Sequence, residues 1–109
     1  MLILIALFAS SIFVGVVTGN GQTVIIDVRT ESEWNAGHLE GAVLIPHEQI
    51  GQEISKISSD RKTKIYLYCR SGRRTGLAFD ILKKSGYEDI INLVTMENSA
   101  KEMNNPIVK

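Results

Sequence analysis

Residues 65–86, IYLYCRSGRRTGLAFDILKKSG, join a strand to a helix through a loop that holds the only cysteine of the chain. The run 65–68 is apolar and aromatic without alternation, which predicts a strand covered on both faces of a sheet. Helical spacing predicts a following helix whose apolar stripe consists of Leu77, Ala78, Ile81 and Leu82. We therefore expect Cys69 at the carboxyl end of a central strand, the edge at which α/β sheets present ligand sites.

The flanking sequence continues the alternation of strands and helices. Apolar runs predict three more strands, over residues 23–28, 42–45 and 90–93. The capping-box pair Thr30 and Glu33 predicts a short helix that ends by Gly37, and isoleucines at helical spacing predict another over residues 47–57. Residues 95–109 are expected to hold one or two helical turns. This order predicts an α/β fold, a small parallel β-sheet flanked by helices on both faces.

The composition limits the classes of protein to which the chain can belong. Its 109 residues suffice for one small domain, and twelve Lys and Arg residues balance twelve Asp and Glu residues, for a formal net charge of +0. A nucleic-acid-binding domain normally carries excess positive charge, so we expect no nucleic-acid partner. One cysteine excludes an intrachain disulfide, a CxxC redox pair and a multi-cysteine zinc site. With two histidines besides, we expect no metal site and no resident cofactor.

The N-terminal segment differs from the rest of the chain. Residues 1–17 carry no charged side chain, and the first basic residue is Arg29. As a helix this segment would be roughly 26 Å long, slightly short of the hydrocarbon core of a bilayer. Small residues up to Gly19 suit signal-peptidase cleavage, so we favour a cleaved export signal over an uncleaved membrane anchor and over a buried helix. We expect residues 1–19 to be this signal or anchor, and residues 20–109 to be a periplasmic or exported domain.

The loop CRSGRRT, residues 69–75, has three properties that lower the pKa of a thiol. The helix that follows directs its free N–H groups and partial positive charge at the loop. Gly72 allows the backbone to curl so that successive N–H groups form an anion-binding nest. Three positive charges within five residues come from Arg70, Arg73 and Arg74. Because the thiolate is the nucleophilic form, we interpret Cys69 as a nucleophile rather than as a structural cysteine beside a solvated basic loop.

These residues resemble the rhodanese (sulfurtransferase) family. The loop CRSGRRT is similar to the family's active-site loop, and Ile26-Asp27-Val28-Arg29 resembles its DVR strand end. Residues 33–42, EWNAGHLEGA, resemble its E-aromatic-x-x-GHIxGA segment, and Leu44-Ile45-Pro46 resembles its NIP segment. Order and spacing agree over residues 24–93, and the likeness is greatest to short, single-domain periplasmic members. The chain departs from the family after the last strand, where residues 93–97 lack the usual Gly-Gly pair that helps to frame the pocket.

The resemblance implies a two-step transfer of sulfane sulfur from thiosulfate or a similar donor to a thiol, or to cyanide in the assay. Cys69 attacks the outer sulfur as a thiolate, sulfite leaves, and the persulfide passes its sulfur to the acceptor. Substrate-binding roles are expected for Arg70, Ser71, Gly72, Arg73, Arg74 and Thr75. Within this set the backbone forms the anion cradle, and Arg70 and Arg74 are favoured as donor-binding side chains over Arg73, for which an orientation toward solvent is the alternative. Thr75 is expected to cap the helix, with a hydrogen bond to the thiolate as the second interpretation.

Other polar residues in these motifs are interpreted as structural. Asp27 and Arg29 are expected to hold loops together at a strand end rather than to act as acid and base. His38 suits a hydrogen-bonding role in its turn better than the role of a base for Cys69. Trp34 is expected to pack in the core.

Two alternative functions are weighed against sulfur transfer. Phosphatases of related fold use Cys-x5-Arg, whereas here Arg74 follows Cys69 after four residues, so the shorter ring suits a sulfur atom better than phosphate. The stronger alternative is a non-enzymatic rhodanese-like module that carries sulfur or binds a partner, which the missing glycine pair favours. Because the chain has no second cysteine, sulfur must pass to an external acceptor. We expect a small thiol or a thioredoxin-like protein as that acceptor, and a monomeric domain.

Overall fold

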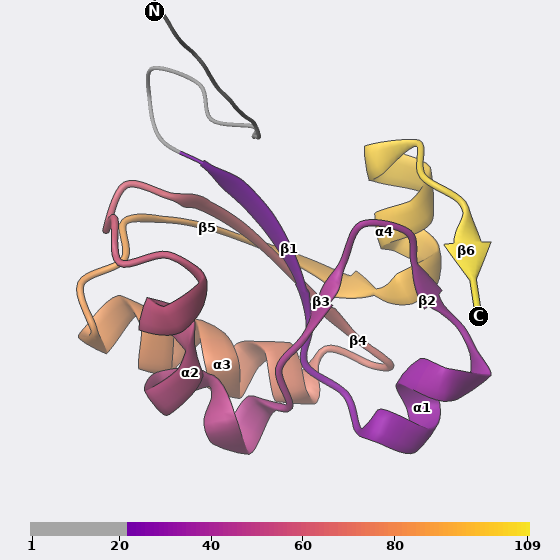
Figure 1. Cartoon of the computed structure of the whole chain (residues 1–109), viewed down its shortest axis with the longest axis horizontal. Coiled ribbons are helices and arrows are strands. Elements are labelled where there is room, and N and C mark those ends of the chain that lie inside the picture. Colours follow the sequence, from indigo (N-terminus) through magenta and orange to yellow (C-terminus); the bar gives the residue numbers. More distant parts are fainter. Residues whose placement is uncertain (1–21) are drawn as a thin grey trace, which may run out of the picture.

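The computed structural model describes residues 22–109, so the expected signal or anchor at residues 1–19 lies outside the described residues. Four parallel strands form the central sheet in the order β3-β1-β4-β5 (Figure 1). They are β1 (Thr23–Asp27), β3 (Val43–Leu44), β4 (Lys64–Cys69) and β5 (Asp89–Thr95). β4 pairs with β1 on one side and with β5 on the other, which confirms the central position predicted for the strand before the loop.

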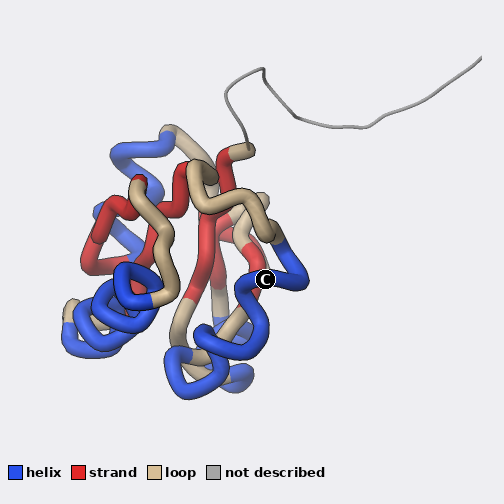
Figure 2. The backbone as a smooth tube through the Cα atoms, turned by 90° about the vertical axis from the view of Figure 1, so that its left-hand side faces the viewer, coloured by secondary structure: helices blue, strands red, loops and turns tan. Residues whose placement is uncertain are grey.

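Helices cover both faces of this sheet. On one face lie α3 (Arg73–Lys84) and α2 (Ile50–Ile57), the latter preceded by a short 3-10 turn (His47–Gln49). α4 (Met96–Met103) packs on the opposite face, and Figure 2 shows helices on both sides of the strands. The predicted α/β architecture is therefore confirmed. Within residues 22–109, no helix combines the length and the apolarity that a bilayer crossing requires.

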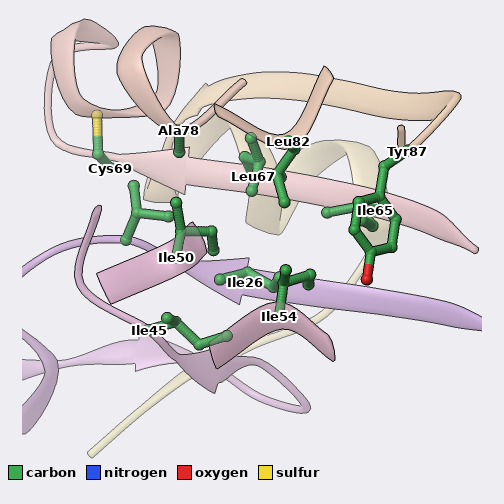
Figure 3. Packing of buried hydrophobic residues seen from close by; sticks show 11 residues of the cluster. Ile26, Ile45, Ile50, Ile54, Ile65, Leu67, Cys69, Ala78, Leu82 and Tyr87 are labelled. Atoms are coloured by element: carbon green, nitrogen blue, oxygen red, sulfur yellow. The ribbon is translucent and has the colours of Figure 1, made fainter. Parts of the chain in front are cut away.

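Alternation along β4 builds two separate cores. Ile65, Leu67 and Cys69 face α2 and α3, where they join the larger hydrophobic cluster drawn in Figure 3. Tyr66 and Tyr68 point to the other face and pack in the smaller cluster beneath α4. Burial of both faces explains why the sequence of β4 shows no polar alternation. Cys69 is the last residue of its row, so its sulfur lies at the end of the larger core (Figure 3).

The capping box predicted from the sequence starts α1 (Glu31–Ala36). The Thr30 hydroxyl accepts a hydrogen bond from the Glu33 N–H group at 3.2 Å, and the Glu33 carboxylate accepts one from the Thr30 N–H group at 3.0 Å. No residue of α1 is buried. Local hydrogen bonds rather than core packing therefore define where this helix begins, which is why its start could be predicted.

The predicted apolar stripe of α3 is partly wrong. Ala78 and Leu82 are fully buried as expected, but Leu77 is 43% exposed and Ile81 is 36% exposed. The helix turns Thr75, Ala78 and Leu82 toward the sheet. Successive residues of a helix are rotated by about 100°, so the residues one position earlier face the flank of the layer. Spacing alone showed a stripe but not which side of it the sheet covers.

A second, two-stranded sheet was not predicted. β2 (His38–Leu39) pairs antiparallel with β6 (Ile107–Val108), which follows α4 at the C-terminal end. The Glu40 N–H group also donates to the Pro106 carbonyl at 2.9 Å. Two-residue strands from distant parts of the chain carry no periodic signal, so only the packing of α4 brings them together.

Tyr68 connects the two sheets, and its removal tests that connection. The fully buried Tyr68 hydroxyl accepts a hydrogen bond from the Leu39 N–H group at 2.9 Å. Tyr68→Phe leaves this buried donor without that acceptor, so we expect the free energy of unfolding in urea to fall by about 1–3 kcal/mol. Tyr66→Phe, two residues away on the same face, is the matched control and should change stability by less than about 0.5 kcal/mol. Equal losses in both variants would contradict this role of the hydroxyl.

Candidate active site

Cys69 occupies the junction that the sequence predicted. It is the last residue of β4, and three residues, Arg70, Ser71 and Gly72, separate it from the first residue of α3. Its residue surface is only 1% exposed. The nucleophile candidate therefore lies at the carboxyl end of a parallel sheet, almost covered by its own loop.

A surface hollow of about 410 Å³ lies elsewhere on the molecule. Gln22 and residues 55–60 line it, near the start of β1 and the end of α2. This is the amino end of the strands, opposite to Cys69. Parallel α/β sheets bind ligands beyond the carboxyl ends of their strands, so chemistry and topology both place the candidate site at Cys69 rather than at this hollow.

The loop brings backbone N–H groups onto the sulfur. The Gly72 N–H group donates to Cys69 Sγ at 3.0 Å. Gly72 has φ +101°, a left-handed conformation that side chains strongly disfavour, and a Cβ added there would lie 2.9 Å from Val94 Cγ1. Both the curl of the loop and the space beside it require glycine. The expectation that Gly72 lets the backbone turn inward is confirmed.

These amides lower the pKa of the thiol. Burial alone raises the pKa of Cys69, but hydrogen bonds from the backbone N–H groups of Thr75, Gly72 and Ser71, with the Thr75 hydroxyl, outweigh burial. The net pKa of Cys69 therefore lies below its ordinary value. The leading stabilising contributions come from main-chain dipoles at the start of α3.

Thr75 does not cap α3, so that prediction was wrong. The N-cap is Gly72, which makes no side-chain cap hydrogen bond, and Thr75 is the third residue of the helix. The helix begins earlier than expected because the left-handed glycine lets Arg73 take helical geometry at once. The buried Thr75 hydroxyl donates to the Gly72 carbonyl at 2.9 Å and lies 3.8 Å from Cys69 Sγ. Thr75 thus closes the loop and contacts the sulfur, but its proton is directed at the Gly72 carbonyl and the thiol donates to the hydroxyl oxygen, the reverse of the hydrogen bond in the second interpretation.

Arg74 is held by a glutamate that sequence reasoning did not assign to the site. Its guanidinium group donates to both oxygens of Glu33, at 2.7 and 3.0 Å. Glu33 is also the capping-box residue of α1, so a single carboxylate ties that helix to the start of α3. The Arg74 guanidinium, together with Thr30, lowers the pKa of Glu33 to about 2 despite partial burial. The sequence signal at Glu33 is its capping box, which predicts a helix start but not a contact with Arg74.

The other two arginines of the loop remain on the surface. The Arg70 side chain is 76% exposed and lies 4.0 Å from a Glu33 oxygen. Arg73 is exposed, in agreement with the alternative of an orientation toward solvent. The nearby Cys69 raises the pKa of Arg74, after the larger effect of its Glu33 hydrogen bonds, so this guanidinium group lies within electrostatic range of the sulfur. Around Cys69, the loop therefore combines one arginine that an ion pair fixes and neutralises, Arg74, with two solvated arginines, Arg70 and Arg73.

The residues interpreted as structural form their own contacts. Asp27 and Arg29 make a buried ion pair at 2.7 Å, and Arg29 also donates to the Gly37 carbonyl at 2.7 Å. His38 Nδ1 lies 2.9 Å from the Trp34 carbonyl, which confirms a hydrogen-bonding role. The two rings stack with centroids 3.5 Å apart, but Trp34 is half-buried and outside both cores, so its predicted core position was wrong. The short α1 holds the ring beside its own turn.

Comparisons with known proteins agree with the resemblance seen in the sequence. A family model described as the rhodanese-like domain matches residues 17–95. Thiosulfate sulfurtransferase PspE of Escherichia coli K12 is 33% identical over 67 residues, which cover 62% of this chain and 64% of PspE. YqhL of Bacillus subtilis is 39% identical over 75 residues, covering 69% of this chain and 58% of YqhL. The chain thus spans less than two thirds of the length of these relatives.

The fold comparison extends further along the chain. A solved structure of a rhodanese with anions from E. coli superimposes with a TM-score of 0.73 at 30% sequence identity. The superposition covers 80% of this chain and 98% of that one. The predicted likeness to the single-domain members is therefore confirmed.

Substitution of Glu33 tests the ion pair that holds the loop. Because its pKa is depressed in the folded state, Glu33 contributes stability that is full above its usual pKa of 4.5 and is lost as pH falls through about 2. We expect Glu33→Gln to lower the free energy of unfolding by about 1 kcal/mol at pH 6, with the difference from wild type vanishing near pH 2. Urea titrations from pH 2 to 7 measure this difference. Glu31→Gln, in the same exposed first turn, is the control, and a pH-independent difference for Glu33→Gln would argue against the pair.

Proposed function

Because the chain belongs to the rhodanese-like sulfurtransferase family, we propose that it moves sulfane sulfur from thiosulfate, or a similar anionic donor, to a thiol through a persulfide on Cys69. The observation that carries this proposal is the hydrogen bond of 3.0 Å from the Gly72 N–H group to the Cys69 sulfur. The Gly72 N–H group is one of the backbone donors that lower the pKa of the thiol. A thiolate at the carboxyl end of a sheet is a nucleophile held in place before any substrate arrives.

The proposed reaction has two balanced steps. In the first, the Cys69 thiolate attacks the outer sulfur of thiosulfate. A bond forms between Sγ and that sulfur, the S–S bond of thiosulfate breaks, and its electron pair leaves with sulfite. In the second step a thiolate, or cyanide in the assay, attacks the terminal sulfur of the persulfide, and the electron pair of the Sγ–S bond restores the Cys69 thiolate.

The loop suits the negative charges of the donor, the leaving group and the persulfide in this reaction. Thiosulfate, sulfite and the terminal sulfur of a persulfide are all anionic, and inward N–H groups stabilise anions without needing to reorganise. We assign the cradle to the backbone of Arg70, Ser71, Gly72, Arg73 and Arg74, closed by Thr75. The exposed Arg70 is free to meet the sulfite portion of the donor, whereas Arg74 is already engaged by Glu33 and acts from a fixed position.

The acceptor and the location are part of the same proposal. With one cysteine the chain has no resolving thiol, so we assign the acceptor role to a small thiol or a thioredoxin-like dithiol protein. Residues 1–19 would serve as export signal or anchor for the domain at residues 20–109, with the periplasm as the proposed location and a monomer as the working form. Membrane contact would be through residues 1–19 alone, and only where that segment is retained.

One observation favours the alternative of a non-catalytic carrier. Cys69 is 1% exposed, so a donor or acceptor must reach a sulfur that its loop almost covers. A module that accepts sulfur once and releases it only to a docked partner would tolerate such cover better than an enzyme of fast turnover. The two functions share the persulfide and differ in turnover.

Persulfide formation is the direct test of the proposal. After incubation with millimolar thiosulfate, the intact mass of the chain should rise by one sulfur, about 32 Da, and dithiothreitol should remove it. Cys69→Ser should show no gain because the chain holds no other thiol. Steady thiocyanate production from thiosulfate and cyanide indicates an enzyme, whereas a stable adduct without turnover indicates the carrier. No added mass in the wild-type chain would contradict both functions.

The two exposed loop arginines give a matched pair for donor binding. We expect Arg70→Ala to raise the KM for thiosulfate roughly three- to tenfold with a smaller change in kcat, because an exposed guanidinium contributes to anion binding at about 1 kcal/mol. Arg73→Ala removes the same charge from the solvent side and should change KM less than twofold. Thiocyanate kinetics at fixed ionic strength measure both variants. Equal effects would reduce the role of Arg70 to net charge alone.

A further inference from the structure

Val94 adopts a backbone conformation that valine normally avoids. Within residues 22–109, two non-glycine residues have positive φ, Asn104 at 57° and Val94 at 73°. Asparagine tolerates the left-handed region, whereas a β-branched side chain there is a genuine outlier. Residues in such conformations cluster at functional sites, where the surrounding structure holds them. Val94 belongs to residues 93–97, which depart from the family by lacking glycine, and the structure places it near the end of β5.

Neighbouring hydrogen bonds hold Val94 in this conformation from both sides. The pairing of β4 with β5 shifts register just before Val94, which leaves Leu93 as an extra residue. The Asn92 side chain accepts from the Val94 N–H group at 2.9 Å, and the Asn98 side chain donates to the Leu93 carbonyl at 2.7 Å. On the C-terminal side the Thr95 side chain caps α4. The strained residue is thus fixed between a bulge and a helix start.

The Val94 side chain is directed at the active-site loop rather than into a core. It is 40% exposed and belongs to neither hydrophobic cluster. Its Cγ1 atom lies 2.9 Å from the point where a Cβ on Gly72 would stand, which means that it packs directly against that glycine. Burial in a core therefore does not explain the strained backbone, and the contact that the Val94 side chain makes instead is with Gly72.

We propose that Val94 is a positioning residue of the thiol site, whose isopropyl group supports Gly72 and keeps the Gly72 N–H group on the Cys69 sulfur. Gly72 is the residue with the greatest backbone freedom in the loop, and it also makes the 3.0 Å hydrogen bond to Sγ. A side chain packed against its Cα restricts that freedom. In this proposal, the strained backbone of Val94 at the end of β5 is what places its side chain against Gly72.

This inference deepens the proposed function but can be tested apart from it. It requires only that the Cys69 thiolate be stabilised by the loop, whatever donor or acceptor the site uses. The charged groups around the loop stay unchanged when residue 94 is replaced. They are Arg70, Arg73 and Arg74 of the loop and α3, Glu33 of α1 and Asp27 of β1. A change in thiol titration therefore reports the amide geometry.

Two substitutions separate the contact from the strain. Val94→Ala removes the two γ-methyl groups, including the Cγ1 that contacts Gly72, but keeps the Cβ in the left-handed region. Val94→Gly removes both and relieves the strain. The rate of iodoacetamide alkylation of the full chain, measured from pH 5 to 10, gives the pKa of its single thiol. The pKa is taken from the pH at which the rate reaches half of its plateau, so the low exposure of Cys69, which slows alkylation at every pH, does not affect the value.

We expect the thiol pKa to rise in both variants by about half a unit or more, which lowers the thiolate fraction roughly threefold at pH 7. The midpoint of thermal unfolding should rise by several degrees in Val94→Gly only. Leu77→Ala, which shortens another exposed apolar side chain, is the control and should leave the thiol pKa unchanged. Should Val94→Gly fold poorly, Val94→Ala still decides the question.

Three outcomes decide between the possible roles of Val94. An unchanged thiol pKa in both variants overturns the proposal, even where the melting temperature rises, because Val94 would then affect stability alone. A pKa that rises in Val94→Gly but not in Val94→Ala also overturns it, since the contact would not be responsible. A raised pKa in both variants of a chain that forms no persulfide supports the positioning role while the proposed function fails.

Discussion

The hydrogen bond from the Gly72 amide to the sulfur of Cys69 is the contact on which this site depends. A buried thiolate is unfavourable, because burial penalises the charged form. The loop reverses that preference with main-chain dipoles, and it can do so only because Gly72 is left-handed and α3 begins at the next residue. The fold contributes by ending a central buried strand at the point where this helix starts. The reactivity that we propose for Cys69 thus depends on backbone geometry, which the side chains of the loop assist.

Two distant elements support that geometry from different sides. Glu33 of α1 fixes Arg74 through a charged, bidentate pair, and Val94 of β5 presses an apolar group on Gly72. The first contact also neutralises one of the loop's positive charges and leaves Arg70 and Arg73 as its solvated cations. The second comes with a left-handed valine, a conformation that costs about 1–2 kcal/mol. The strained backbone of Val94 therefore lies beside the loop that holds the candidate nucleophile.

Much of the fold was predictable because its signals are local. The β4 run and the capping box at Thr30 depend on neighbouring residues, and both elements appear where they were predicted. The failures have a common cause. Leu77 and Ile81 belong to an apolar pattern, but the pattern does not say how far the opposing layer extends, and the short strands β2 and β6 exist only because packing brings two chain segments together. The spacing of apolar residues indicates which side chains favour burial, whereas the layer that packs against the helix decides which of them are buried.

The same division applies to the site. That one thiol, close to a glycine and three arginines, stands between a buried strand and a helix follows from the order of residues alone, because they are neighbours in the chain. The sequence also shows that the loop can curl, since Gly72 has no Cβ. Three contacts became visible only in the folded chain: Thr75 closes the loop from inside the helix, Glu33 engages Arg74, and Val94 packs on Gly72. Those contacts join residues far apart in sequence or depend on the exact start of a helix, and no local pattern encodes either.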